Sequence, residues 1–184
     1  MAKVILSKVS TKAPEKMDKS ETKLETENLL KEMAELQKVM YAERKHSLLV
    51  ILQGLDTSGK DGTVRAVFSQ TSPLGVHTHS WKVPTVDERD HDYLWRIHHQ
   101  VPAAGEVMIF NRSHYEDVLV PVVNGWIDAR ETKRRYAQIN DFERMLTETG
   151  TIVAKFMLHI SKDEQRERLQ QRLDDPAKRW KFAL

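Results

Sequence analysis

Ser47-Leu-Leu-Val-Ile-Leu-Gln53, followed directly by Gly54-Leu-Asp-Thr-Ser-Gly59-Lys60-Asp61-Gly62-Thr63, is the stretch that decides the fold. Its first half is a short, continuous apolar run, which is typical of a strand covered on both faces, as in a parallel sheet. Its second half is a glycine-rich turn, and a helix is expected from about residue 60 to residue 69. Strand, glycine loop and helix in this order are the context of a phosphate-binding loop.

The loop matches the Walker A pattern G-x-x-x-x-G-K-[ST] except at its last position, which is Asp61. Glycines let the backbone turn so that N–H groups point at an anion, and the helix N-terminus adds a favourable dipole. Lys60 supplies a mobile positive charge for a phosphoryl oxygen. The predicted phosphate-binding residues are those of the loop: Gly54, Thr57, Ser58, Gly59, Lys60, Asp61, Gly62 and Thr63.

Two carboxylates, Asp56 and Asp61, lie in this loop, where other P-loop enzymes use a hydroxyl to help hold Mg²⁺. A carboxylate that faces phosphates repels them unless a cation lies between. Asp56 is therefore the predicted metal ligand, and Thr63 or Asp61 is the second candidate. The alternative is a glycine-rich turn without a ligand, which the flanking strand and helix disfavour.

Further apolar runs predict strands over 78–83, 106–110 and 152–160. Helical spacing and capping signals predict helices over 23–45, 87–100, 132–149 and from Ser161 onwards. Strands that alternate with helices indicate an α/β fold of three layers, with a parallel sheet between helices. Residues 1–22 are polar and Lys-rich, so we expect a flexible segment in which 4–6 pair at a sheet edge at most.

A dense polar cluster, Asn111-Arg-Ser-His-Tyr-Glu-Asp117, follows the strand over 106–110. Ligands of open α/β sheets bind beyond the carboxyl ends of the strands. Asn111 stands where P-loop enzymes usually carry the Walker B Asp, and Glu116 or Asp117 can supply the missing charge. Arg112 can clamp a phosphate with two hydrogen bonds. The alternative is an ordinary solvated loop.

Basic residues crowd the C-terminal part of the chain, among them Arg172, Lys178, Arg179 and Lys181. They fit a mobile lid over about 161–182 that brings cations to a polyanion. Charge runs are usually solvated surface, and the phosphate loop upstream is what favours the lid.

The chain has 184 residues, no Cys and a net charge of +2. The absence of Cys excludes disulfides, thiolate metal sites and a Cys nucleophile and fits a cytoplasmic protein, and the length fits one domain. No apolar run approaches the roughly 18 residues of a membrane helix, so no membrane association is expected. Nucleic acid is not an expected partner, because the basic segments carry few stacking aromatics.

Five motifs in order resemble the family-2 polyphosphate kinases, and the resemblance runs from about residue 25 to the end. They are the loop 54–63, Pro84-Thr with 91–96, Phe110–Leu119, Arg135-Tyr136 with Ile139–Glu143, and residues 172–182. The block Asn111–Leu119 is similar to the subgroup called class III. The resemblance implies a P-loop kinase fold like that of thymidylate kinase over 23–184, with the C-terminal part of the family domain absent from this chain.

The resemblance further implies phosphoryl transfer between inorganic polyphosphate and AMP or ADP, yielding ADP and ATP, with Mg²⁺ (or Mn²⁺). Asp56 and Asp117 would hold the metal, and Lys60, Arg112 and Glu116 would complete the catalytic set. Asn111, Arg112 and Glu116 would bind the nucleotide. Arg172, Lys178, Arg179 and Lys181 would belong to a lid over the polyphosphate, and a homo-oligomer, dimer or tetramer, is expected.

Two other functions remain open from the sequence. An ATP-dependent kinase of a small molecule or a nucleoside monophosphate would use the same loop and lid. An inactive phosphate-binding fragment would bind ligand without turnover, and ligand would then raise its melting temperature.

Overall fold

A single parallel sheet of four strands forms the centre of the computed structural model, which describes residues 4–179. The strands are β1 (Ser47–Gly54), β2 (Val76–Ser80), β3 (Val107–Asn111) and β4 (Thr151–Leu158), in the spatial order β2-β3-β1-β4. Leu49 pairs with both Met108 and Val153, so β1 is an inner strand with neighbours on both sides. The predicted parallel sheet is confirmed.

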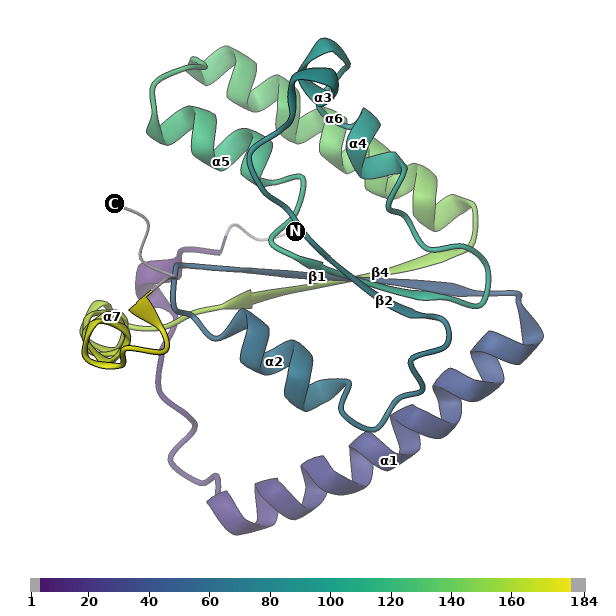
Figure 1. Ribbon diagram of the computed structural model, residues 1–184, viewed down its shortest axis with the longest axis vertical. Coiled ribbons are helices and arrows are strands. Elements are labelled where there is room, and N and C mark those ends of the chain that lie inside the picture. Colours follow the sequence, from purple (N-terminus) through teal and green to yellow (C-terminus); the bar gives the residue numbers. More distant parts are fainter. Residues whose placement is uncertain (1–3, 180–184) are drawn as a thin grey trace.

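Helices cover both faces of this sheet, as predicted for three layers (Figure 1). One face carries α3 (Val86–Asp90), α4 (Trp95–His98), α5 (Glu116–Val123) and α6 (Ala129–Glu148). The other carries α1 (Lys19–Glu43) and α2 (Lys60–Val67), while α7 (Lys162–Asp174) lies beyond the carboxyl ends of β1 and β4. Buried β1 side chains alternate between two clusters: Leu49 and Ile51 pack with Phe110 and Phe142, and Val50 and Leu52 pack with Ile109.

The first long helix begins earlier than the predicted residue 23, because Asp18 caps it. The Asp18 carboxylate accepts hydrogen bonds from the backbone N–H groups of Ser20 and Glu21. The edge pairing allowed for residues 4–6 is wrong: Leu6–Lys8 forms a short 3-10 helix, and no described strand includes residues 4–6.

The helix predicted over 87–100 is two short helices. Thr85 and Glu88 form a complete capping box that starts α3. The Asp92 side chain then accepts a hydrogen bond from the Leu94 N–H, and the Asp92 carbonyl accepts one from Trp95. These local bonds compete with the helical ones and break the segment between α3 and α4.

Helix α5 was not predicted, because four valines and Pro121 have low helix propensity. Pro121 has no N–H, so the carbonyl of Asp117, four residues before it, loses its helical partner. Arg135 of α6 donates to that carbonyl at 2.7 Å. Together with the fully buried Val118, this contact lets tertiary structure stabilise a helix that its own sequence disfavours.

A polar cluster around the buried His114 and Glu143 joins the loop after β3 to α6 and to the exposed Lys155 of β4. Glu143 Oε1 accepts hydrogen bonds from His114 Nε2 (3.1 Å) and the Tyr115 hydroxyl (3.0 Å), and Lys155 donates to Glu143 Oε2. Burial alone would raise the pKa of Glu143, but the hydrogen bonds from His114 and Lys155 outweigh it and lower that pKa. Burial acts to lower the pKa of Lys155, and the Glu143 carboxylate overcomes it and raises that pKa.

We therefore expect the Glu143 carboxylate to stabilise the fold above its ordinary pKa of 4.5 and to lose that contribution as the pH falls through its lowered value. Glu143→Gln should be less stable than wild type at pH 7. The difference in unfolding free energy between the two proteins, measured by urea titration, should be smaller at pH 4 than at pH 7. The exposed Glu148→Gln on the same helix is the control. A gap that stays constant with pH would contradict the ionised pair.

Candidate active site

The connections leave β1 and β3 in opposite directions. The chain passes from β1 into α2 on one face and from β3 through α5 and α6 on the other. Such a switch point opens a crevice beyond the carboxyl ends of the two strands, which is where α/β proteins bind ligands. A cleft of about 990 Å³ lies there. Its lining residues are Asp56, Thr57, Ser58, Gly59, Lys60, Asp61, Gly62, Arg65, Ser80, Trp81, Lys82, Asn111, Arg112, Arg172 and Lys178.

The backbone of the loop between β1 and α2 restricts which residues can stand at two of its positions, Gly54 and Thr57. A Cβ on Gly54 would lie 2.5 Å from Ser58 Oγ and 2.8 Å from the Leu158 carbonyl, so only glycine fits. Thr57, with φ 64°, holds a left-handed conformation that is strained for a branched side chain. Its buried hydroxyl has no hydrogen-bond partner among residues 4–179. Strain and an unpaired donor in one residue mark a loop shaped for a ligand.

The Lys60 ammonium turns back into this loop. Its Nζ donates to the carbonyls of Gly54 (2.9 Å) and Leu55 (3.0 Å) and lies 3.4 Å from Ser58 Oγ. Burial, and then the nearby Arg112 guanidinium, lower the pKa of Lys60. The ammonium therefore braces the loop from within while it lines the cleft.

Asp56 lies at the mouth of the cleft and meets α7. Its carboxylate is more than half exposed and pairs with Arg172 Nη1 at 3.3 Å. Two more α7 side chains reach the loop backbone: Gln165 donates to the Asp56 carbonyl and Arg168 to the Thr57 carbonyl. The predicted lid helix thus packs its polar face on the phosphate loop in this structure.

The second strand end faces the loop across the cleft. Asn111 Nδ2 donates to Asp61 Oδ1 at 2.6 Å, which links β3 to the start of α2. Arg112 has φ 66°, and its Nη1 lies 3.4 Å from Glu116 Oε2. Gln53 of β1 donates to the other Glu116 oxygen at 3.1 Å. The Glu116 carboxylate therefore orients Arg112 at the edge of the cleft.

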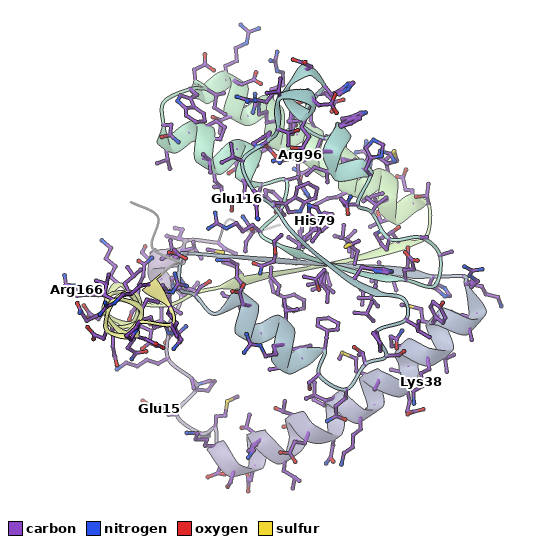
Figure 2. All side chains as sticks on the ribbon, in the orientation of Figure 1. Glu15, Lys38, His79, Arg96, Glu116 and Arg166 are labelled. Carbon is purple, nitrogen blue, oxygen red and sulfur yellow. The ribbon has the colours of Figure 1, made fainter. Side chains whose placement is uncertain are left out.

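Asp117 is held inside the fold. Both of its carboxylate oxygens accept hydrogen bonds from Arg96 Nη2, at 3.1 and 2.9 Å. Arg96 also donates to the Lys82 carbonyl and lies over the Trp81 ring, 5.1 Å from its centroid. Burial raises the pKa of Asp117 even though Arg96 acts to lower it. Arg96 and Glu116 lie on the α3–α6 side of the sheet (Figure 2).

The structure brings most of the predicted site residues to this cleft. Gly54, Thr63, Glu116, Asp117 and Arg179 do not line it, and Lys181 lies outside the described residues. Arg179 donates to the Leu173 carbonyl at the end of α7. The lining residues not predicted are Arg65, Ser80, Trp81 and Lys82. Two of these positions could have been predicted from the sequence. Lys82 follows the carboxyl end of a strand, and Arg65 lies four residues after Asp61 on the same helix face.

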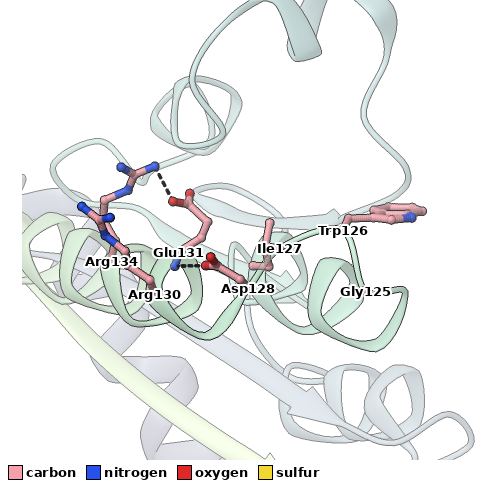
Figure 3. A pocket seen from close by; sticks show the side chains of 7 residues that line it. All are labelled: Gly125, Trp126, Ile127, Asp128, Arg130, Glu131 and Arg134. Atoms are coloured by element: carbon pink, nitrogen blue, oxygen red, sulfur yellow. Dashed lines mark hydrogen bonds and ion pairs between the residues drawn. The ribbon is translucent and has the colours of Figure 1, made fainter.

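A second hollow, about 670 Å³, lies at the turn between α5 and α6 and contains none of the predicted residues (Figure 3). The Glu131 carboxylate there pairs with Arg134, and Asp128 caps α6 by accepting from the Glu131 N–H. These charges are used within the helix, so the cleft at the phosphate loop is the candidate site.

The donor set of the cleft suits a magnesium-type cation. Mg²⁺ in proteins usually binds one or two carboxylates together with waters and substrate phosphates. The exposed Asp56 carboxylate fits that role, with cation-rich walls beside it for the phosphates. Within residues 4–179, no group of three or more His, Asp or Glu side chains is arranged to hold a metal by itself. None of the described helices is long and apolar enough to cross a membrane.

Comparisons with known proteins point to one family. A family model described as Polyphosphate kinase 2 (PPK2) matches residues 16–184. The chain is 54% identical over 156 residues to the AMP/ADP-polyphosphate phosphotransferase of Meiothermus ruber, covering 85% of this chain and 58% of that protein. It is 40% identical over 163 residues to the ADP-polyphosphate phosphotransferase of Rhodopseudomonas palustris, covering 82% and 56%.

A solved structure agrees with the sequence relatives. Polyphosphate kinase 2 from Arthrobacter aurescens TC1 superposes with a TM-score of 0.92 at 48% identity, over 98% of this chain and 66% of that one. The chain thus spans a little over half the length of these curated relatives.

Proposed function

The chain belongs to the polyphosphate kinase 2 family, and from that premise we propose that it transfers a phosphoryl group between inorganic polyphosphate and AMP or ADP, yielding ADP and ATP. The observation that carries the proposal is the cleft that the phosphate loop, Arg112, Arg172 of α7 and Lys178 line together. A long polyanion needs such a set of cations, and a nucleotide phosphate needs the loop.

In this proposal the protein works by positioning and charge neutralisation. The acceptor oxygen of a nucleotide phosphate is already ionised, so no covalent enzyme intermediate is required. Loop N–H groups and Lys60 hold the phosphoryl oxygens, with Lys60 giving up a loop carbonyl as a phosphate arrives. Arg112, oriented by Glu116, binds where the nucleotide meets the transferred group. Asn111, bonded to Asp61, shapes the same edge of the cleft.

We propose Mg²⁺ (or Mn²⁺) as the cofactor, with Asp56 as its main ligand. When bound, the metal neutralises charge on the phosphoryl oxygens. Asp117 is the second ligand that the family resemblance suggests. It is the weaker assignment, because its carboxylate is only 12% exposed and does not line the cleft, whereas that of Asp56 is 56% exposed and does.

Asp56→Asn should raise the Mg²⁺ concentration needed for half-maximal rate by at least about tenfold, since an amide oxygen carries no net charge. Rates measured across a Mg²⁺ titration at saturating substrates test this. Asp141→Asn, an exposed carboxylate on α6, is the matched control. An unchanged Mg²⁺ requirement would assign the metal to another residue.

The activity itself is tested by mixing the chain with Mg²⁺, long-chain polyphosphate and either AMP or ADP, and separating nucleotides by anion exchange. ATP from ADP, and ADP then ATP from AMP, are the expected products. Parallel reactions omit polyphosphate or replace it with ATP. Turnover with ATP and AMP alone would support an ATP-dependent kinase instead. Absence of any product would refute the proposal for this chain.

We also propose a cytoplasmic homo-oligomer, a dimer or tetramer, as the working form. The absence of Cys supports the cytoplasmic location. The exposed apolar side chains of Ile152 and Phe156 on β4 support the oligomer. Light scattering of the purified chain tests the second, and a monomer at assay concentration would contradict it.

A further inference from the structure

Glu143 lies on α6 outside the cleft, yet its carboxylate holds the segment that carries Arg112 and Glu116. The hydrogen bonds from His114 and Tyr115 both end on its Oε1, at 3.1 and 3.0 Å. These two donors lie between Arg112 and Glu116 in the sequence. A shift of Glu143 would therefore be passed directly to both residues.

The segment needs such an anchor because its backbone is strained. Arg112 adopts a left-handed φ of 66° without being glycine. Ser113 and His114, directly after it, are fully buried. A non-glycine residue persists in this conformation only when its surroundings hold it there. The His114 ring packs edge-on against Phe110 and Phe142, which fixes the ring position but gives its Nε2–H no partner other than Glu143 among the described residues.

Lys155 of β4 completes the anchor. Its ammonium donates to Glu143 Oε2 and to the Tyr115 hydroxyl, the latter at 3.1 Å. The groups that face Glu143 are thus the His114 ring and the Lys155 ammonium, with the Tyr115 hydroxyl between them. Three elements, the β3–α5 loop, α6 and β4, meet at one carboxylate. Arg135, also on α6, donates a hydrogen bond to the Asp117 carbonyl, so α6 contacts both ends of the segment 114–117.

We propose that Glu143 is a positioning residue for phosphoryl transfer, because it sets the loop that presents Arg112 and Glu116 to the cleft. Glu143 does not touch the substrates in this role. The inference rests on the proposed function for its kinetic consequence, whereas the anchoring itself can be measured without turnover.

The kinetic test compares Glu143→Leu, Glu143→Gln and the control Glu148→Leu on the exposed face of α6. Glu143→Leu removes the acceptor, and a misplacement of the loop by about 1 Å should lower kcat per folded molecule by about 10²-fold. Glu143→Gln keeps an oxygen that accepts from His114 and Tyr115, so it should retain most of kcat. Glu148→Leu should match wild type. Assays run well below each variant's Tm, so that a merely structural role would leave kcat unchanged.

Hydrogen exchange provides the measurement that is independent of activity. Glu143→Leu should lose amide protection in residues 111–117 while β1 and β4 keep theirs. Tyr115→Phe, which deletes one hydroxyl and no packing, should give a smaller loss in the same segment and serves if Glu143→Leu does not fold. Unchanged protection of 111–117, or loss spread evenly over the chain, would overturn the proposal. If wild type shows no phosphotransfer, only the proposed function fails, and the exchange result still decides the anchor.

Discussion

Replacing Lys60 by alanine should lower the rate of phosphoryl transfer by about 10²–10³-fold, which corresponds to about 2.7–4 kcal/mol of barrier. Lys60 is the buried cation of the phosphate loop, and it lines the cleft. Because the Lys60 ammonium is buried, it is worth far more to the charge that develops on the transferred group than an exposed ammonium would be.

Two further measurements make this result specific. Lys60 Nζ also braces the loop through the Gly54 and Leu55 carbonyls, so Tm must be followed to separate loss of rate from loss of fold. Lys38→Ala on α1, an exposed lysine paired with Glu35, is the control and should keep the wild-type rate. A Lys60→Ala enzyme with near-normal rate would show that the loop does not bind the transferred phosphate.

Arg96→Met should destabilise the fold by about 3–5 kcal/mol, the largest loss of stability that we expect from one substitution. Arg96 is buried and Asp117 is mostly buried, with side-chain exposures of 6% and 12%. Removal of Arg96 leaves the Asp117 carboxylate in a site that already raises its pKa. The deficit should shrink toward acidic pH, because a protonated Asp117 no longer needs a cation. Urea unfolding at pH 7 and pH 5 measures both effects.

Matched variants identify the cause of the loss. Arg144→Met removes an exposed arginine of α6 that pairs with Asp141, and should cost at most about 1 kcal/mol. The double variant Arg96→Met/Asp117→Leu removes both charges and should recover much of the loss. If Arg96→Met is no worse than Arg144→Met, the buried pair contributes little. If the double variant is as unstable as the single one, the lost packing of Arg96 on Trp81 is responsible instead.

The local sequence predicted well those features that depend on one short segment. The apolar run of β1 is typical of a covered strand, and the loop needs Gly54 because a Cβ there would meet Ser58 and the Leu158 carbonyl. The alternation of strands and helices then led to a parallel sheet, since parallel strands need long crossovers. The site residues on that loop could therefore be predicted, because they are neighbours in sequence and form one motif.

Features that depend on contacts between distant residues were missed, because the local sequence carries no sign of the distant partner. Helix α5 exists because Arg135 satisfies the carbonyl that Pro121 leaves free, and nothing near Pro121 in sequence signals that partner. The break between α3 and α4 is a local feature that was also missed, because a helical period does not reveal the hydrogen bonds of Asp92 to residues 94 and 95. Asp117 looked like a residue of the cleft, and only the fold showed that Arg96, 21 residues away, engages its carboxylate.

The sequence by itself thus determined the three-layer α/β fold and the glycine loop, because hydrophobic period and glycine geometry act over a few residues. The family followed from the resemblance of five motifs. The tertiary structure alone decided which charges meet. It placed Arg172 against Asp56, Arg96 against Asp117, and His114, Tyr115 and Lys155 around Glu143. Such pairs form between side chains that are far apart along the chain, and their strength depends on burial, which only packing of the complete fold establishes.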